Sequence, residues 1–161
     1  MIAIACVFLS AAGFYFSTGL GEQWWLAWLA PVPVLWFAFG PSRLRQAFLV
    51  SFLAYALGGC SLLRAYGAAM PVPVLILVVA GPALCFALAV MGAKLVRERR
   101  GPLSAMFAFA ALWAAVDFLS AFNQAGGAVS TPAASQVGAT VLIQLLSVTG
   151  FAGLTFLLGW V

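Results

Sequence analysis

Apolar residues occupy six long stretches of the chain, and short polar segments separate these stretches. Charged side chains are almost confined to the separating segments, and the longer stretches approach the ~20 residues that a helix needs to cross a bilayer. We therefore predict an all-α integral membrane protein, a bundle of about six transmembrane helices that forms a single domain over residues 1–161. The predicted helices cover residues 2–17, 24–39, 46–63, 72–95, 103–122 and 140–161.

The composition excludes a water-soluble domain. Hydrophobic residues make up 66% of the chain and charged residues 6%, whereas a soluble domain is roughly 45–50% apolar and about 25% charged. The chain has no histidine, and the spacing of its three cysteines fits neither a metal site nor a redox motif. We therefore expect no metal and no cofactor, and we interpret Cys6, Cys60 and Cys85 as buried free thiols.

Basic residues gather in two of the predicted loops. Six of the seven lie there: Arg43 and Arg45 in the second loop, and Lys94, Arg97, Arg99 and Arg100 in the fourth. By the positive-inside rule, these residues are topology anchors that place the N-terminus, both basic loops and the C-terminus in the cytoplasm. A patch for lipid headgroups or nucleic acid is the other interpretation, but a topology signal accounts for the pattern and we expect no nucleic-acid partner.

Prolines punctuate two of the predicted helices. Pro31 and Pro33 should interrupt the stretch 24–39, and Pro82 should kink the stretch 72–95. The sequence PVPVL occurs at 31–35 and again at 71–75. Duplicated halves are common in transporters, but the two copies diverge outside these five residues, so chance or proline punctuation is the preferred interpretation.

Asp117 is the only acidic residue inside a long apolar stretch. An ionisable group there is costly and is a functional candidate by default. Its helical spacing places it on one face with Ala110, Ala114 and Ala121, where a neighbouring helix can approach closely. Two roles stay open: a carboxylate that locks the bundle by hydrogen bonds, or a direct ligand contact. With the polar loop 123–136, the candidate substrate-binding residues are Asp117, Asn123 and Gln136.

Several motifs, in order along nearly the whole chain, carry a family resemblance. They are LAPVPVLWF, RLRQA, GGCSLLRAY, MPVPVLIL, ALWAAVDFL and the final run SQVG…LIQLLSVTGFAGLTFLL. In these the chain resembles the N-terminal membrane portion of apolipoprotein N-acyltransferase, the bacterial enzyme of lipoprotein maturation. The family usually has an acid at the position of Asp117 and commonly an Arg shortly after it. Here Ser120 and Ala121 stand nearby, so the chain resembles a divergent branch.

The resemblance implies a two-step acyl transfer from a membrane phospholipid to the N-terminal diacylglyceryl-cysteine of a lipoprotein. The family's Glu-Lys-Cys triad belongs to a nitrilase-like domain that we expect to lie outside these 161 residues, in cis or in trans. No catalytic residue is therefore expected in the chain, which alone should be inactive. It would be a membrane platform in the bacterial cytoplasmic (inner) membrane that admits phospholipid and the diacylated lipoprotein. A small multi-pass transporter and a non-catalytic membrane assembly protein are the alternatives.

Overall fold

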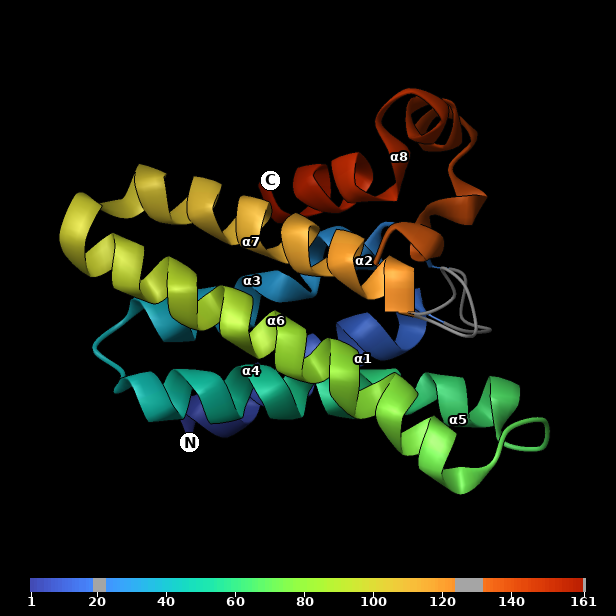
Figure 1. Cartoon of the computed structure of the whole chain (residues 1–161). Coiled ribbons are helices and arrows are strands. Elements are labelled where there is room, and N and C mark those ends of the chain that lie inside the picture. The colour runs from blue at the N-terminus through green and yellow to red at the C-terminus, as the bar shows by residue number, and fades with distance from the viewer. Residues whose placement is uncertain (19–22, 124–131, 161) are drawn as a thin grey trace.

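The computed structural model describes residues 1–18, 23–123 and 132–160, without the side chains at 65 and 120–123. Every regular element in these ranges is a helix, which confirms the predicted fold class (Figure 1). The elements in chain order are α1 (Ile2–Ser17), α2 (Leu26–Leu29), α3 (Pro31–Phe39), α4 (Leu44–Gly59), α5 (Ser61–Tyr66), α6 (Val72–Arg100), α7 (Pro102–Asn123), the 3₁₀ helix η2 (Pro132–Gly138) and α8 (Thr140–Trp160).

Four segments of the described chain are long and apolar enough to cross a membrane. They are Leu44–Arg64, Val72–Arg100, Pro102–Leu119 and Thr140–Trp160, and two shorter apolar helices cover Ile2–Ser17 and Leu26–Phe39. These six segments correspond to the six predicted stretches, and the chain is a multi-pass membrane protein. The helix predicted for 72–95 extends to Arg100 and so includes the basic residues Arg97, Arg99 and Arg100.

The helix predicted for 24–39 is interrupted, as the sequence predicted, at Pro31. α2 ends at Leu29 and Pro31 occupies the first position of α3, whereas Pro33 lies within α3 and does not interrupt it. Pro71 is the N-cap of α6. Both copies of PVPVL therefore begin a helix, where a missing backbone N–H costs no intrahelical hydrogen bond. This agrees with proline punctuation as the reason for the repeat. Pro82 lies inside α6, which remains one helix from Val72 to Arg100.

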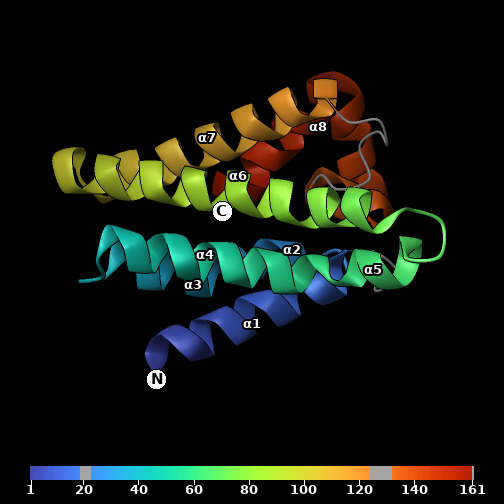
Figure 2. The same cartoon turned by 60° about the horizontal axis from the view of Figure 1, so that its bottom comes forward.

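The helices pack in a simple spatial order. α4, α6 and α7 follow one another through the middle, α1 packs on the outer side of α4, and α8 packs on α7 (Figures 1 and 2). The α3–α4 turn and the α6–α7 turn lie at one end of the bundle, on the left in Figure 1, which we call the basic end. The opposite end, where α1 and α7 finish and α5 lies, is called the loop end.

An aromatic cluster fills the centre of the bundle. Phe86 of α6 is fully buried, and its ring lies 5.1 Å from that of Tyr55, 5.4 Å from Phe14, 5.9 Å from Phe109 and 5.2 Å from Trp113. Most of these pairs are edge-to-face or tilted, which are the arrangements that aromatic rings prefer. Because these rings come from α1, α4, α6 and α7, the cluster joins four helices.

The last predicted helix is not continuous. α8 has a non-helical residue, Gly150, with φ 68° and ψ 179°. Backbone in this region is almost restricted to glycine. The structure has the predicted helix over Thr140–Trp160, but with a kink at Gly150 that the apolar pattern of the stretch does not reveal.

Candidate functional site

Asp117 is buried between two helices. It lies in the last third of α7, its residue is 8% exposed, and its Oδ2 accepts a 2.6 Å hydrogen bond from Thr155 Oγ1 of α8. The small-residue face predicted for α7 is also buried, with Ala110 at 0% and Ala114 at 8%, while the side chain at 121 lies outside the described part. A second helix does approach this face, because a Cβ on Gly159 of α8 would lie 3.0 Å from Ala110 Cα.

A small cavity adjoins the carboxylate. Its volume of about 20 Å³ is room for about one water molecule. Its lining brings polar groups from separate helices together: the Tyr55 phenol of α4, the Cys85 thiol of α6 and the Asp117 carboxylate. Pro82, Trp113, Val116 and Pro132 complete the lining.

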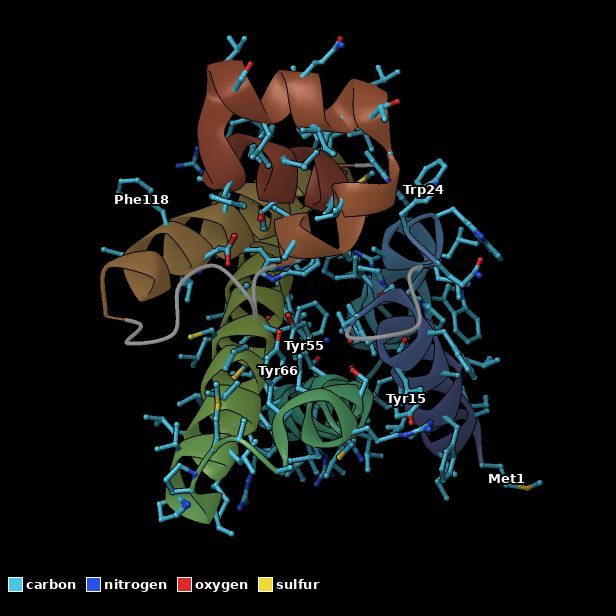
Figure 3. The ribbon with its side chains drawn as sticks, turned by 90° about the vertical axis from the view of Figure 1, so that its right-hand side faces the viewer. Met1, Tyr15, Trp24, Tyr55, Tyr66 and Phe118 are labelled. Atoms are coloured by element: carbon cyan, nitrogen blue, oxygen red, sulfur yellow. The ribbon has the colours of Figure 1, made fainter. Side chains whose placement is uncertain are left out.

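A second cavity of about 20 Å³ lies on the other side of Tyr55 and Pro82, which line both cavities. It lies among α1, α4 and α6, and its remaining lining is Phe14, Thr18, Gly59, Leu62, Val78 and Val79. Figure 3, viewed from the loop end, places Tyr55 in the middle of the bundle, whereas Phe118 of α7 points away from it. Tyr55 and Pro82 therefore line both a largely apolar cavity and the cavity that Asp117 lines.

Gln136 occupies a different position from the one its loop assignment indicated. It belongs to η2 and is 1% exposed. Its Oε1 accepts a 3.1 Å hydrogen bond from Trp28 Nε1, and its Nε2 donates to the Trp24 carbonyl oxygen at 3.0 Å and to Ser135 Oγ at 2.9 Å. The Gln136 amide thus links η2 to Trp24, which lies just before α2, and to Trp28 within α2. Gln136 does not line the Asp117 cavity, although Pro132 of the same 3₁₀ helix does.

Asn123, the third candidate, ends α7, and its side chain lies outside the described part. The structure therefore places only Asp117 at the cavity. Tyr55, which lines the cavity, and Thr155, which donates to Asp117, could not be singled out from the sequence, because each is a single polar group in an apolar stretch. Cys85 was noticed but interpreted as a buried structural thiol. The structure finds all three cysteines free, Cys6 buried and the other two half-buried.

Six of the seven basic residues lie at one end of the bundle, and Arg64 of α5 is the exception. Two of the six make hydrogen bonds to backbone carbonyls. Lys94 is 5% exposed, and its Nζ donates to the carbonyl oxygens of Ala38 at 2.8 Å and Gly40 at 3.3 Å. Arg97 donates to the Phe39 carbonyl oxygen and lies 5.2 Å from the centroid of the Phe39 ring. Cations at these last carbonyls complement the negative end of the α3 dipole. The remaining four anchors, Arg43, Arg45, Arg99 and Arg100, are exposed.

Among the described residues, no group of three or more His, Cys, Asp or Glu side chains is placed to hold a metal ion. The potential chemistry of the site is therefore that of one carboxylate, one phenol and one thiol at a water-sized cavity. These groups can accept or donate hydrogen bonds to a polar group that enters, in surroundings otherwise formed by apolar side chains.

The fold and the site define an all-helical, multi-pass membrane protein with a buried carboxylate near the loop end of its bundle. Residues 5–161 match the family model described as the apolipoprotein N-acyltransferase N-terminal domain. The chain therefore belongs to the apolipoprotein N-acyltransferase family, as its membrane N-terminal domain, which confirms the resemblance found in the sequence motifs. Comparisons with curated proteins and with solved structures found no match.

Proposed function

We propose that this chain is the membrane platform of an apolipoprotein N-acyltransferase. In the proposed reaction, the Cys thiolate of a nitrilase-like domain attacks an acyl ester of a phospholipid, which forms a thioester and releases a lysophospholipid. The α-amine of a lipoprotein's diacylglyceryl-cysteine then attacks the thioester, which forms an amide and regenerates the thiol. The nucleophile, its Lys and its Glu all belong to the nitrilase-like domain, and the present chain holds the lipid substrates at the bilayer.

The buried carboxylate of Asp117 at a cavity between three helices carries this proposal. An ionisable residue within an apolar membrane helix is expensive and marks a functional position by default. Asp117 lies toward the loop end, opposite the basic end. With the basic end in the cytoplasm, the carboxylate lies in the half of the bundle nearer the bacterial periplasm. That is the side on which an extracytoplasmic catalytic domain would meet lipid substrates.

In this proposal, Asp117 orients the acceptor amine or a lipid headgroup, since a carboxylate forms strong charge-assisted hydrogen bonds with an ammonium. Asn123 and Gln136 remain candidate substrate contacts. The three protein hydrogen bonds of the Gln136 amide favour a positioning role for it, in which it holds η2 beside the cavity. Bringing the reactants together at the bilayer surface can lower the barrier by roughly 7–11 kcal/mol.

The test is genetic complementation. The chain fused to a nitrilase-like domain should support growth of an acyltransferase-depleted strain, whereas the chain alone should not. In vitro, the purified chain alone should transfer no acyl group from phospholipid to a diacylated lipopeptide. Turnover by the chain alone that is lost in Cys60→Ala or Cys85→Ala would contradict the platform role. Failure of a fusion that is inserted and stable would do so as well.

A small transporter is the second candidate, favoured by the buried acid and by the break in α8. The two cavities have room for about one water molecule each, which is less than an organic solute requires. Uptake of solute into proteoliposomes containing the chain would favour the transporter. Absence of uptake together with complementation by the fusion would favour the platform.

A further inference from the structure

The first half of α8, residues 140–149, differs from the other apolar segments in its direction. Its axis runs across the loop end of the bundle, so that it is seen nearly end-on in Figure 1 and crosswise at the top of Figure 3. Ten helical residues extend about 15 Å, which is half of the ~30 Å hydrocarbon core of a bilayer. This half-helix is therefore too short to cross the membrane by itself.

The depth of the half-helix follows from the contacts of the second half of α8, which runs antiparallel to α7. Thr155 lies beside Asp117, through their hydrogen bond, and Gly159, farther along α8, packs against Ala110, nearer the start of α7. Five residues before Thr155, about 7.5 Å toward the loop end, the chain reaches Gly150. Asp117 is six residues, or about 9 Å, from Asn123 at the end of α7. Gly150 thus lies level with the last turn of α7, and residues 140–149 lie at or beyond the end of that helix.

Two glycines make the bend for different reasons. Gly150 has φ 68°, and a Cβ added to it would meet no heavy atom within 4 Å, so only its backbone conformation requires glycine. Gly153 has no such φ, but a Cβ on it would lie 2.3 Å from Thr149 Cβ. The bend is therefore a built feature of the fold, because the side chain of Thr149 occupies the space that Gly153 leaves.

The half-helix is amphipathic in a way that fits a membrane surface. Thr140, Gln144 and Ser147 are spaced by four and three residues, so they share one face, and all three are exposed. The half-buried residues Leu142, Leu145 and Leu146 lie on the side toward the bundle. Beside the polar face, Val141 is 76% exposed and Val148 82% exposed. In hydrocarbon an exposed amide would lack hydrogen-bonding partners, whereas at the headgroups water supplies them.

We propose that residues 140–149 form an interfacial helix that binds the lipid surface at the loop end and is not part of a transmembrane span. Val141 and Val148 enter the boundary between headgroups and acyl chains, Thr140 and Ser147 face water, and Gln144 lies at the edge between the two faces. Since this half-helix has no charged residue, the contact with lipid is apolar. This inference does not depend on the acyltransferase role, because any protein with this bend would bind the lipid surface in the same way.

Spin-label accessibility in proteoliposomes tests the proposal on the full chain. Single cysteines replace Val141, Gln144, Ser147 and Val148 in a Cys6→Ala, Cys60→Ala, Cys85→Ala background. Matched control labels replace the lipid-exposed Leu103, Phe107 and Phe118 of α7. We expect a water-soluble nickel complex to relax the label at 147 most and oxygen to relax those at 141 and 148, with the label at 144 between them because it lies one helical turn from both valines. Depth should oscillate at the helical period. In a transmembrane helix, depth would instead change by about 13 Å from residue 140 to 149.

Hydrogen exchange of the unsubstituted protein in lipid nanodiscs gives a second readout that needs no cysteine variant. Amides of 140–149 should exchange much faster than those of 103–118, because water reaches an interfacial helix and is excluded from the hydrocarbon core. Protection of 140–149 equal to that of α7, or a steady depth gradient along the labels, would overturn the proposal. Oscillating depth together with fast exchange would establish it.

Discussion

The Lys94 ammonium donates a 2.8 Å hydrogen bond to the Ala38 carbonyl oxygen, across 56 residues of sequence. The bond joins the buried part of α6 to the last turn of α3, and Gly40 accepts from the same nitrogen. The only acid paired with Lys94 in the described part, Glu98, lies 3.7 Å away and its side chain is 59% exposed. The backbone carbonyls are therefore the main partners of this buried ammonium, and Lys94 links α3 to α6.

Replacing Lys94 with Met should lower the free energy of unfolding by about 1.5–3 kcal/mol, the usual contribution of hydrogen bonds to a charged group. Thermal unfolding in detergent, followed by circular dichroism, measures the change. Arg99→Gln is the matched control, since Arg99 is exposed, and it should change stability by less than about 0.5 kcal/mol. Equal effects of the two variants would mean that the carbonyl contacts of Lys94 contribute nothing.

Variants of Asp117 and Thr155 distinguish the two roles open to the carboxylate, a hydrogen bond that locks the bundle and a direct contact with a ligand. If it locks the bundle, Asp117→Asn should be mild because an amide oxygen still accepts from Thr155. Asp117→Leu should destabilise by about 1–3 kcal/mol. In a double-mutant cycle with Thr155→Val, the coupling should be about 0.6 kcal/mol, the average for membrane helices.

If the charge itself contacts a substrate, Asp117→Asn should lose complementation by the fusion as completely as Asp117→Leu does, while its thermal stability stays at the wild-type value. Thr155→Val serves as the control, since it removes the hydrogen bond and leaves the carboxylate. Full stability and full complementation by both Asp117 variants would refute both roles.

Gly58 allows α4 to cross α1 at close range. A Cβ on Gly58 would lie 2.3 Å from Phe14 Cβ and 3.2 Å from the Ala11 carbonyl oxygen. Gly58→Ala should therefore destabilise the protein by about 1–3 kcal/mol, as overpacking does. Gly81→Ala is the comparison, since a Cβ there meets nothing within 4 Å apart from its chain neighbours, one of which is Pro82, so no other helix has to move. A larger loss of thermal stability in Gly58→Ala than in Gly81→Ala is the expected result, and equal losses would contradict the close crossing of α4 and α1.

The orientation of the bundle in the membrane is testable with reporter fusions. Ser42 and Gly101 lie in the turns of the basic end and should report cytoplasmic positions. A fusion at Gly127, in the segment that the structure does not describe, should report the opposite side. A periplasmic signal from Gly101 would contradict the predicted topology.

The sequence by itself determined the membrane class, the approximate limits of the six apolar segments and the gathering of the basic loops at one end. These properties follow from the free energy of transferring each apolar stretch from water to lipid and from the positions of Lys and Arg between the stretches. They can be read without knowing which helices pack together. The small-residue face around Asp117 was also predictable, because helical periodicity alone places Ala110 and Ala114 beside it.

Only the tertiary structure decided which groups meet. Thr155 is 38 residues from Asp117 and Gln136 is 108 residues from Trp28, and nothing in the local pattern distinguishes these polar residues from others in the same stretches. The bend at Gly150 is equally hidden, since glycine is compatible with helix and with left-handed backbone alike. The second half of α8 packs on α7, and a contact between two helices is a property of the folded chain.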